Sequence, residues 1–423
     1  MNTFLEKLKL VFKDPVLRNR VFFTIGALII FRLLAIIPIP GIDPLQLKNL
    51  FANNQFLGLL DIFSGGGLST FSIMMLGVGP FITATIIMQL LTMVFPKLKA
   101  LYQEEGEAGR MKFAQYSRLL TIPLSIIQGY SFMILLERQQ VVTNIGSFSM
   151  LINIVIITAA SLLLMWIGEL ITEFGIGNGV SLLIFAGIVS RIPAVTSQLA
   201  FTFDVSQIPL YLGFLVAALL IVLGVVVVTE AERPIPVTYA RRVRGMKVYG
   251  GVSTYLPLRL NQAGVIPIIF ALSILLFPQV IVNLLSGFDN VIVQAISGAL
   301  LSLLSNLWLY SSVYFVLVVV FTYFYTAVTF DPHTLSTNLQ KNGAFIPGVR
   351  PGQSTADYIS RILTRITLVG ALFLGLVAIL PLAMRAITGI AALTIGGTAL
   401  LIVVSVVLDL MKKIDAQISM REY

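Results

Sequence analysis

The sequence predicts an all-α fold, that of a polytopic membrane protein with ten transmembrane helices. Hydrophobic residues make up 57% of its 423 residues and charged residues only 11%, and the mean hydropathy is +0.95. A globular surface facing water does not have this composition. Ten apolar stretches divide the chain, and most of them reach the ~20 residues that a helix needs to cross ~30 Å of hydrocarbon.

The predicted spans cover residues 21–37, 71–95, 113–136, 150–171, 180–189, 210–229, 263–285, 307–329, 366–384 and 389–408. The fifth stretch is short and bounded by glycines. We expect its helix to begin near Asn178 and to share the turn Gly175 to Gly179 with the span before it.

Basic residues lie in alternate gaps between the spans. One side carries only Lys48, Arg138, Arg191 and Arg385, and the other side carries nearly all the remaining Lys and Arg. Because basic residues mark the cytoplasmic side, both termini are expected in the cytoplasm, and the +9 net charge belongs to cytoplasmic loops. Such loops attract anionic lipid, ribosomal RNA or an acidic protein face.

The domain organisation follows from the spans. Residues 1–20 are predicted to form an amphipathic cytoplasmic segment, 21–200 the first five spans, 205–410 the last five, and 411–423 a cytoplasmic tail. Residues 21–37 run into Pro38 and Pro40 without a cleavage pattern, so we expect them to remain as the first span. Since five is odd, the second half begins on the opposite side of the membrane, as in the inverted repeats of transporters and channels.

The predicted spans contain few ionisable side chains. Arg32 is the ionisable residue expected within a span, as a gate residue or as an arginine that reaches toward the head groups; Arg118, Glu169 and Glu173 lie near cytoplasmic ends. A coupling cation needs oxygen ligands near mid-membrane. The chain has no nucleotide-binding P-loop and a single histidine, His333. We therefore expect no enzyme activity, metal or cofactor, and energy supplied by a partner.

Two long loops, 230–262 and 330–365, face the cytoplasm and exceed simple connectors. The first places Arg241, Arg242, Arg244 and Lys247 among apolar residues, which suits a hairpin or a basic docking arm. In the second, the segment GAFIPGVRPG at Gly343 to Gly352 would hold Arg350 on a stiff, exposed turn. For both loops the alternative is a solvated contact with anionic lipid.

Four motifs resemble one family. GAFIPGVRPG, GIGNG at 175–179, QAGVIP at 262–267 and GGTALLIVVSVVLD at 396–409 are similar to the SecY family of protein-conducting channels, and the resemblance covers essentially the whole chain. It implies a clamshell of two inverted five-helix halves around a central pore in the bacterial plasma membrane. Such a channel passes unfolded preproteins across the membrane and releases apolar segments sideways into lipid. The implied partners are SecE, SecG, and the SecA ATPase or a translating ribosome.

The resemblance also implies a pore ring of branched aliphatic side chains: Val78, Ile82, Val180, Ile184, Ile269 and Ile402. The first two pairs are spaced by four residues, so each pair shares one helix face. Such a ring admits water and ions poorly and carries no fixed charge that would hold a passing polypeptide. Read without the family, these residues are ordinary packing or lipid contacts.

A short apolar run within 55–70 is implied to be a re-entrant plug helix with a glycine hinge. Its residues are Phe56, Leu57, Leu60, Ile62, Phe63, Gly65, Gly66 and Gly67. The alternative is an amphipathic helix on the membrane surface.

A lateral gate is implied where spans two and seven part. Its residues are Thr83, Thr85, Gln89, Asn178 and Phe277. Thr85 and Gln89 share a face and are expected to hydrogen-bond across the seam for roughly 1 kcal/mol per bond; polar contacts in a permanent bundle are the alternative. Docking of SecA or the ribosome is assigned to Arg241, Arg242, Arg244, Lys247 and Arg350. The competing classes are a secondary transporter of small solutes and a scaffold for membrane assembly.

Overall fold

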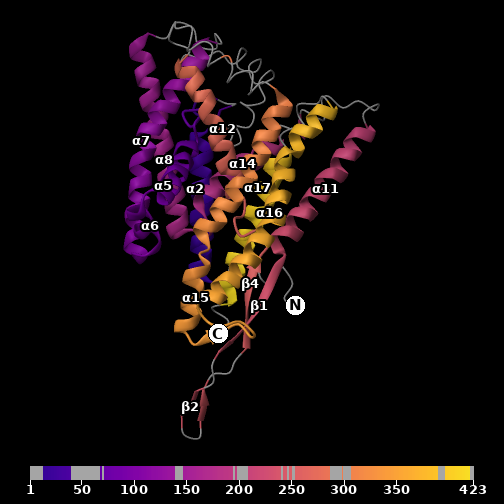
Figure 1. Cartoon of the computed structure of the whole chain (residues 1–423). Coiled ribbons are helices and arrows are strands. Elements are labelled where there is room, and N and C mark those ends of the chain that lie inside the picture. The colour runs from indigo at the N-terminus through magenta and orange to yellow at the C-terminus, as the bar shows by residue number, and fades with distance from the viewer. Residues whose placement is uncertain are drawn as a thin grey trace.

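Apolar helices packed side by side form most of the molecule (Figure 1). The computed structural model describes residues 13–39, 67–68, 71–138, 146–193, 196–197, 208–239, 242–244, 247–249, 253–285, 298, 306–388 and 396–419. In these ranges one helix corresponds to each of the ten predicted spans: α2 (Pro15–Leu34), α5 (Gly79–Val94), α7 (Gly106–Arg138), α8 (Ser147–Phe174), α9 (Gly179–Val189), α11 (Ile208–Glu230), α12 (Ile266–Leu285), α14 (Leu307–Thr329), α16 (Gln353–Thr388) and α17 (Gly396–Ser419).

Within the described ranges, four helices alone are long and apolar enough to cross a membrane by length and composition, namely α7, α8, α14 and α16. A fifth span results if α5 is joined to α6 (Pro96–Gln103), from which it is bent by 117°. The bend lies at Phe95, which has extended backbone angles before Pro96. Large apolar side chains along α2 and α11 remain exposed, as expected of helices that face lipid.

The second predicted span is only partly helical. Its helix begins at Gly79, and the preceding residues form turns instead of the helix expected from residue 71. The amide of Ile39 donates to the carbonyl of Phe71 at 2.8 Å, and that of Ile73 donates to Ile37 at 2.9 Å. These two bonds form a short antiparallel bridge between residues 37–39 and 71–73. The backbone of residues 71–73 is paired across this bridge and therefore does not form a helix.

The fifth span begins where the glycine turn predicts. Asn178 is the N-cap of α9, and its side chain accepts a hydrogen bond from the amide of Ser181 at 3.1 Å. The amide of Gly179 donates to Thr172 Oγ1 on α8 at 2.9 Å. A Cβ at Gly179 would overlap the carbonyl oxygen of Gly168, so α8 and α9 meet backbone to backbone.

One hydrophobic cluster draws buried residues from α2, α5, α8 and α9 and from α11, α12, α14, α16 and α17. The two predicted halves therefore share a core. Across the boundary between them, α12 packs against α5 and α7, and α17 packs against α9.

Strands occupy the first predicted cytoplasmic loop. β1 (Glu232–Tyr239) pairs antiparallel with β4 (Ser253–Arg259), with Glu232 opposite Arg259. β2 (Arg242–Arg244) and β3 (Lys247–Tyr249) form a second antiparallel pair, which lies far from the helices (Figure 1). The hairpin is therefore the correct alternative for this loop. The all-α prediction left these strands out, although helices dominate the fold.

Helices make up most of the second predicted loop. It contains α15 (Pro332–Lys341) and β5 (Ala344–Phe345), which adds to the free edge of β1. The helix α16 begins at Gln353, well before the predicted residue 366, and α17 continues to Ser419 beyond the predicted end at 408. Membrane helices thus extend past the apolar stretch because nothing in those polar residues breaks the helix.

Candidate functional site

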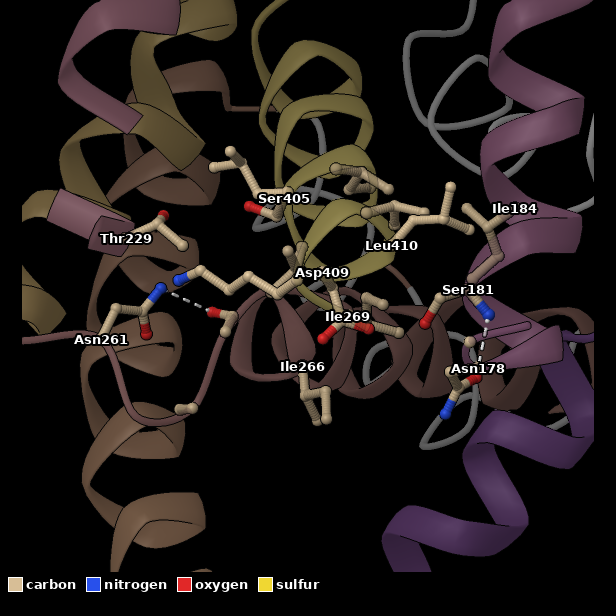
Figure 2. A pocket seen from close by; sticks show the side chains of 18 of the residues that line it. Asn178, Ser181, Ile184, Thr229, Asn261, Ile266, Ile269, Ser405, Asp409 and Leu410 are labelled. Atoms are coloured by element: carbon tan, nitrogen blue, oxygen red, sulfur yellow. Dashed lines mark hydrogen bonds between the residues drawn. The ribbon is translucent and has the colours of Figure 1, made fainter. Parts of the chain in front are cut away.

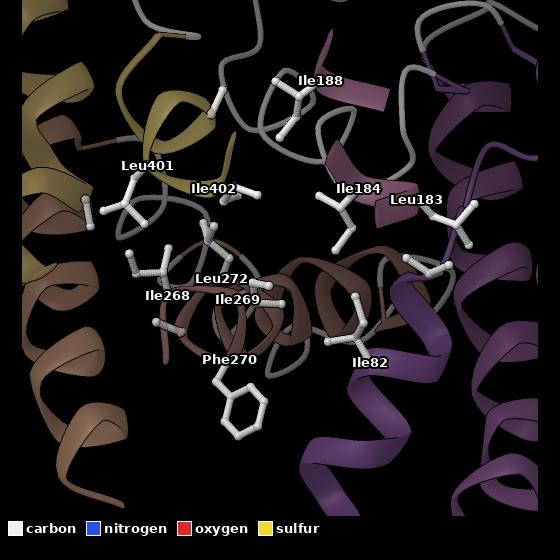
Figure 3. Packing of buried hydrophobic residues seen from close by; sticks show 14 of the residues in the cluster. Ile82, Leu183, Ile184, Ile188, Ile268, Ile269, Phe270, Leu272, Leu401 and Ile402 are labelled. Atoms are coloured by element: carbon white, nitrogen blue, oxygen red, sulfur yellow. The ribbon is translucent and has the colours of Figure 1, made fainter. Parts of the chain in front are cut away.

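Aliphatic side chains from four helices converge at the centre of the molecule. Ile82 on α5, Ile184 on α9, Ile269 on α12 and Ile402 on α17 belong to one cluster and are at most 8% exposed. Figure 3 shows Ile82, Ile184, Ile269 and Ile402 extending toward the same space. Val78 is buried in this cluster too, and the half-buried Val180 packs against it. The structure thus brings together the six residues predicted for the pore ring.

The ring residue Val78 lies at the N-cap of α5 and not inside the helix. Just before it, Gly77 adopts a left-handed backbone with φ of 56°. The buried hydroxyl of Ser161 on α8 donates to the carbonyl oxygen of Gly77 at 3.0 Å. A side chain of α8 therefore fixes the turn before α5, next to Val78.

A cavity of about 280 Å³ opens beside the ring. Ile184, Ile269 and Ile402 are among its apolar lining residues, and its polar lining residues come mainly from the start of α9, the segment from the end of β4 to α12, and α17 (Figure 2). The polar lining residues include Asn178, Ser181, Arg259, Asn261, Gln262, Ser405, Asp409, Lys412 and Lys413. We call this cavity the vestibule.

Ion pairs border the vestibule. Lys412 Nζ lies 2.8 Å from Glu230 Oε1, the last residue of α11, and Lys413 Nζ lies 3.0 Å from Asp409 Oδ2. The sequence analysis missed the vestibule. The signal was present in α17, where Ser405, Asp409 and Lys412 recur at helical spacing and so share one face.

The residues predicted for the lateral gate lie on three different helices or their caps. Thr83 and Thr85 lie on α5, which packs against α12. The hydroxyl of Thr85 donates to the carbonyl of Phe81 in its own helix at 2.9 Å, so it does not provide the expected bond across the seam. Gln89 Oε1 is buried and accepts no hydrogen bond from a described residue. Asn178 lines the vestibule, and the side chain of Phe277 on α12 lies outside the described residues.

The predicted docking residues occupy two places. Arg242 and Arg244 lie in β2 and Lys247 in β3, while Arg241 and the side chains of these three lie outside the described part. Arg350 is exposed, between Gly348 and Gly352, whose φ angles are 81° and 99°. Its carbonyl accepts a hydrogen bond from Thr355 Oγ1 at 2.8 Å.

Of the predicted plug residues, Phe56, Leu57, Leu60, Ile62, Phe63, Gly65 and Gly66 lie outside the described residues. Gly67 is described, and its carbonyl accepts a hydrogen bond from the amide of Ser72 at 2.9 Å. A Cβ at Gly67 would lie 2.7 Å from the carbonyl oxygen of Met74. Only glycine fits there without displacement of the neighbouring turn.

The arrangement is that of a multi-pass membrane protein in which a buried aliphatic cluster lies beside a cavity partly lined by polar residues. The family model described as SecY matches residues 72–411. A protein of Mycobacterium tuberculosis H37Rv named "Protein translocase subunit SecY" is 41% identical over 96% of this chain and 96% of its own length. Its namesake from Thermotoga maritima is 40% identical over 99% of this chain and 96% of its own length. This chain belongs to the SecY family.

Solved structures agree in fold. A protein-conducting channel matches with a TM-score of 0.65 at 18% identity, covering 95% of this chain and 92% of that one. Sec61 in a canine ribosome-channel complex matches with a TM-score of 0.62 at 17% identity over the same shares. Together with the bacterial relatives, the fold assigns the chain to the multi-pass proteins of the bacterial plasma membrane.

Proposed function

We propose that this chain forms the pore of a channel that passes unfolded preproteins across the bacterial plasma membrane and releases apolar segments sideways into lipid. The observation that carries the proposal is the convergence of Ile82, Ile184, Ile269 and Ile402 from four helices in one buried cluster, beside the vestibule that the last three also line. Membership of a family whose curated relatives are named protein translocase subunits supports it.

The ring acts as a seal and as a neutral passage. Branched aliphatic side chains leave no hydrogen-bonding partner for water, so ions enter the constriction poorly. The same side chains make no directional bond with a polypeptide, and a segment of any sequence slides through at similar cost. The vestibule offers polar groups, which keep an unfolded chain solvated before it reaches the ring.

The seam between α5 and α12 is the proposed lateral exit. Since Thr85 bonds within its own helix, the contact of these helices depends mainly on apolar packing. Lipid tails replace such packing at little cost. An apolar segment in the pore can therefore part the helices and leave through the gap. Phe277 and Asn178 are assigned to the two ends of this region, and the segment 55–70 is assigned to the plug.

The proposed partners rest on the basic residues of the loops and on membership of the SecY family. Both termini and the hairpin are placed in the cytoplasm because the basic residues gather there. The tip of the hairpin, with Arg241, Arg242, Arg244 and Lys247, and the exposed Arg350 turn are the proposed contacts for SecA or a ribosome. SecE and SecG are the proposed membrane partners, and anionic lipids the proposed lipid contacts. ATP hydrolysis by SecA or chain elongation by the ribosome supplies the directionality.

The proposal is tested by transport of a radiolabelled secretory precursor into liposomes that contain this chain with SecE and SecG. SecA and ATP are added outside. Precursor that becomes protected from protease only with ATP supports the channel. A liposome that binds SecA and yet protects no precursor would contradict it.

A matched solute assay separates the alternatives. The same liposomes should accumulate no amino acid, sugar or ion with a proton or sodium gradient. Gradient-driven uptake without precursor transport would identify a secondary transporter.

A further inference from the structure

A short segment connects the β1–β4 hairpin to α12, the helix assigned to the lateral gate, and we call this segment the joint. It consists of residues 260–265, which follow β4 and precede α12. The chain connects the β1–β4 hairpin to α12 through these six residues. The ring residue Ile269 lies in the first turns of α12, directly beyond the joint.

The hairpin side of the joint is anchored twice. The amide of Leu260 donates to the carbonyl of Ala231 at 2.8 Å, which closes the base of the β1–β4 hairpin against the end of α11. On the opposite side, Gly370 of α16 lies against Leu260, and a Cβ there would come within 2.6 Å of the Leu260 carbonyl oxygen. Leu260 is therefore fixed both to α11 and to α16.

The α12 side of the joint depends on Asn261. Its side-chain Nδ2 donates to the carbonyl oxygen of Gly264 at 3.1 Å (Figure 2). Gly264 has φ of 61°, and the space beside it is open to 4 Å. Glycine is thus required by the backbone angle and not by crowding. The bond from Asn261 closes this turn from the side of the hairpin.

The burial of Asn261 helps to explain why an asparagine occupies this position. Asn261 is 7% exposed, and its Oδ1 is buried without a hydrogen bond from any described residue. A buried acceptor without a partner is unfavourable. An apolar residue would avoid this penalty, so the bond to Gly264 accounts for an asparagine at this position.

We propose that Asn261 is a positioning residue of the channel, which locks the Gly264 turn so that a displacement of the hairpin moves α12 and Ile269 as one body. This inference rests on the proposed function, and it adds how a contact on the hairpin would reach the ring. Without the Asn261 bond, Gly264 acts as a swivel and the displacement ends at the joint.

Spin labels can measure the coupling directly, because the chain has no cysteine of its own. Cysteines at Thr254 on β4 and Ile281 on α12, both exposed, report the distance across the joint. A second pair, Thr254 and Glu232, reports the hairpin itself. Pulsed electron resonance is recorded on the channel with SecE and SecG in lipid.

Asn261→Ala should at least double the width of the distance distribution across the joint and leave the pair within the hairpin unchanged. Gly264→Ala should shift and broaden the distribution, because alanine disfavours this backbone angle. Combined with Gly264→Ala, Asn261→Ala should add no further broadening, since both act on one turn. The control Asn342→Ala, at an exposed asparagine after α15, should match the parent.

An unchanged width in Asn261→Ala would overturn the proposal, as would fully additive broadening in the double variant. If Asn261→Ala does not fold, Gly264→Ala decides alone, and an unshifted distribution in that variant overturns the proposal. The precursor assay distinguishes a failure of this inference from a failure of the proposed function. If the parent channel transports precursor and the width in Asn261→Ala is unchanged, only the positioning role of Asn261 is excluded. If the parent channel transports no precursor, the proposed function is excluded.

Discussion

The hydroxyl of Ser161 on α8 donates a hydrogen bond to the carbonyl oxygen of Gly77, one residue before Val78. Both partners are buried in the helix bundle, where water does not compete for the bond. The side chain of Ser161 therefore holds the backbone next to Val78, the first of the residues proposed for the ring.

Replacement of Ser161 by alanine should lower stability and loosen the seal. The Gly77 carbonyl loses its donor, at a cost of about 1–2 kcal/mol. Thermal unfolding in detergent should shift down by a few degrees, and ion leak through the idle channel should rise. The control is Ser312→Ala on α14, whose exposed hydroxyl bonds only to its own helix. Equal leak in the two variants would contradict the role of Ser161.

The ring is tested by Ile82→Asn and Ile402→Asn. Both side chains are buried among other aliphatic groups, so an amide there attracts water into the constriction. We expect conductance in planar bilayers to increase several-fold and precursors with weak signal sequences to be accepted. The volume-conserving change Ile402→Leu should keep the seal. Parental conductance in both asparagine variants would remove these residues from the ring.

The contact of α8 with α9 predicts a strong effect of one methyl group. In Gly179→Ala the added Cβ would overlap the Gly168 carbonyl and lie 2.8 Å from the Cβ of Ile171. The helices must separate, at roughly 1–3 kcal/mol, and Ile184 moves with α9. Gly213→Ala is the matched control because nothing lies within 4 Å of that position on α11. Similar unfolding midpoints for the two variants would contradict the close packing.

Arg350→Glu should reduce SecA-driven transport at least tenfold while the protein still inserts into the membrane. The turn is held by bonds to its backbone, such as the one from Thr355 Oγ1, so the exchanged side chain does not disturb the fold. Arg350→Lys should retain part of the activity, and Lys341→Glu on α15 controls for charge alone. Equal transport by Arg350→Glu and Lys341→Glu would exclude a specific docking role.

The membrane helices were predictable because the length and apolar character of a span are local properties. Asn178 and its glycine turn fixed even the start of α9. The start of α5 was not predictable, since residues 71–78 are apolar and their turns depend on pairing with 37–39. Hydropathy records that a residue avoids water and does not record whether its backbone is helical.

The ring depended on family resemblance. Ile269 and Ile402 are far apart in the chain, and only the tertiary fold brings them into one cluster. The cross-seam bond expected from Thr85 was wrong because a threonine hydroxyl in a helix can reach the carbonyl four residues earlier. The vestibule was missed because its polar residues come from segments that are far apart in the chain, such as Ser181, Asn261 and Asp409.

The bridge between 37–39 and 71–73 has a mechanical consequence for the segment assigned to the plug. The bonds from Ile39 to Phe71 and from Ile73 to Ile37 hold the two ends of that segment together. The chain between them must therefore leave from this bridge and return to it. Residues 40–70 can reach no more than roughly 50 Å from the bridge, because the chain must go out and come back and an extended residue spans about 3.4 Å. In the role proposed for it, the plug would thus stay tethered at both ends to one point of the channel, whatever path it follows.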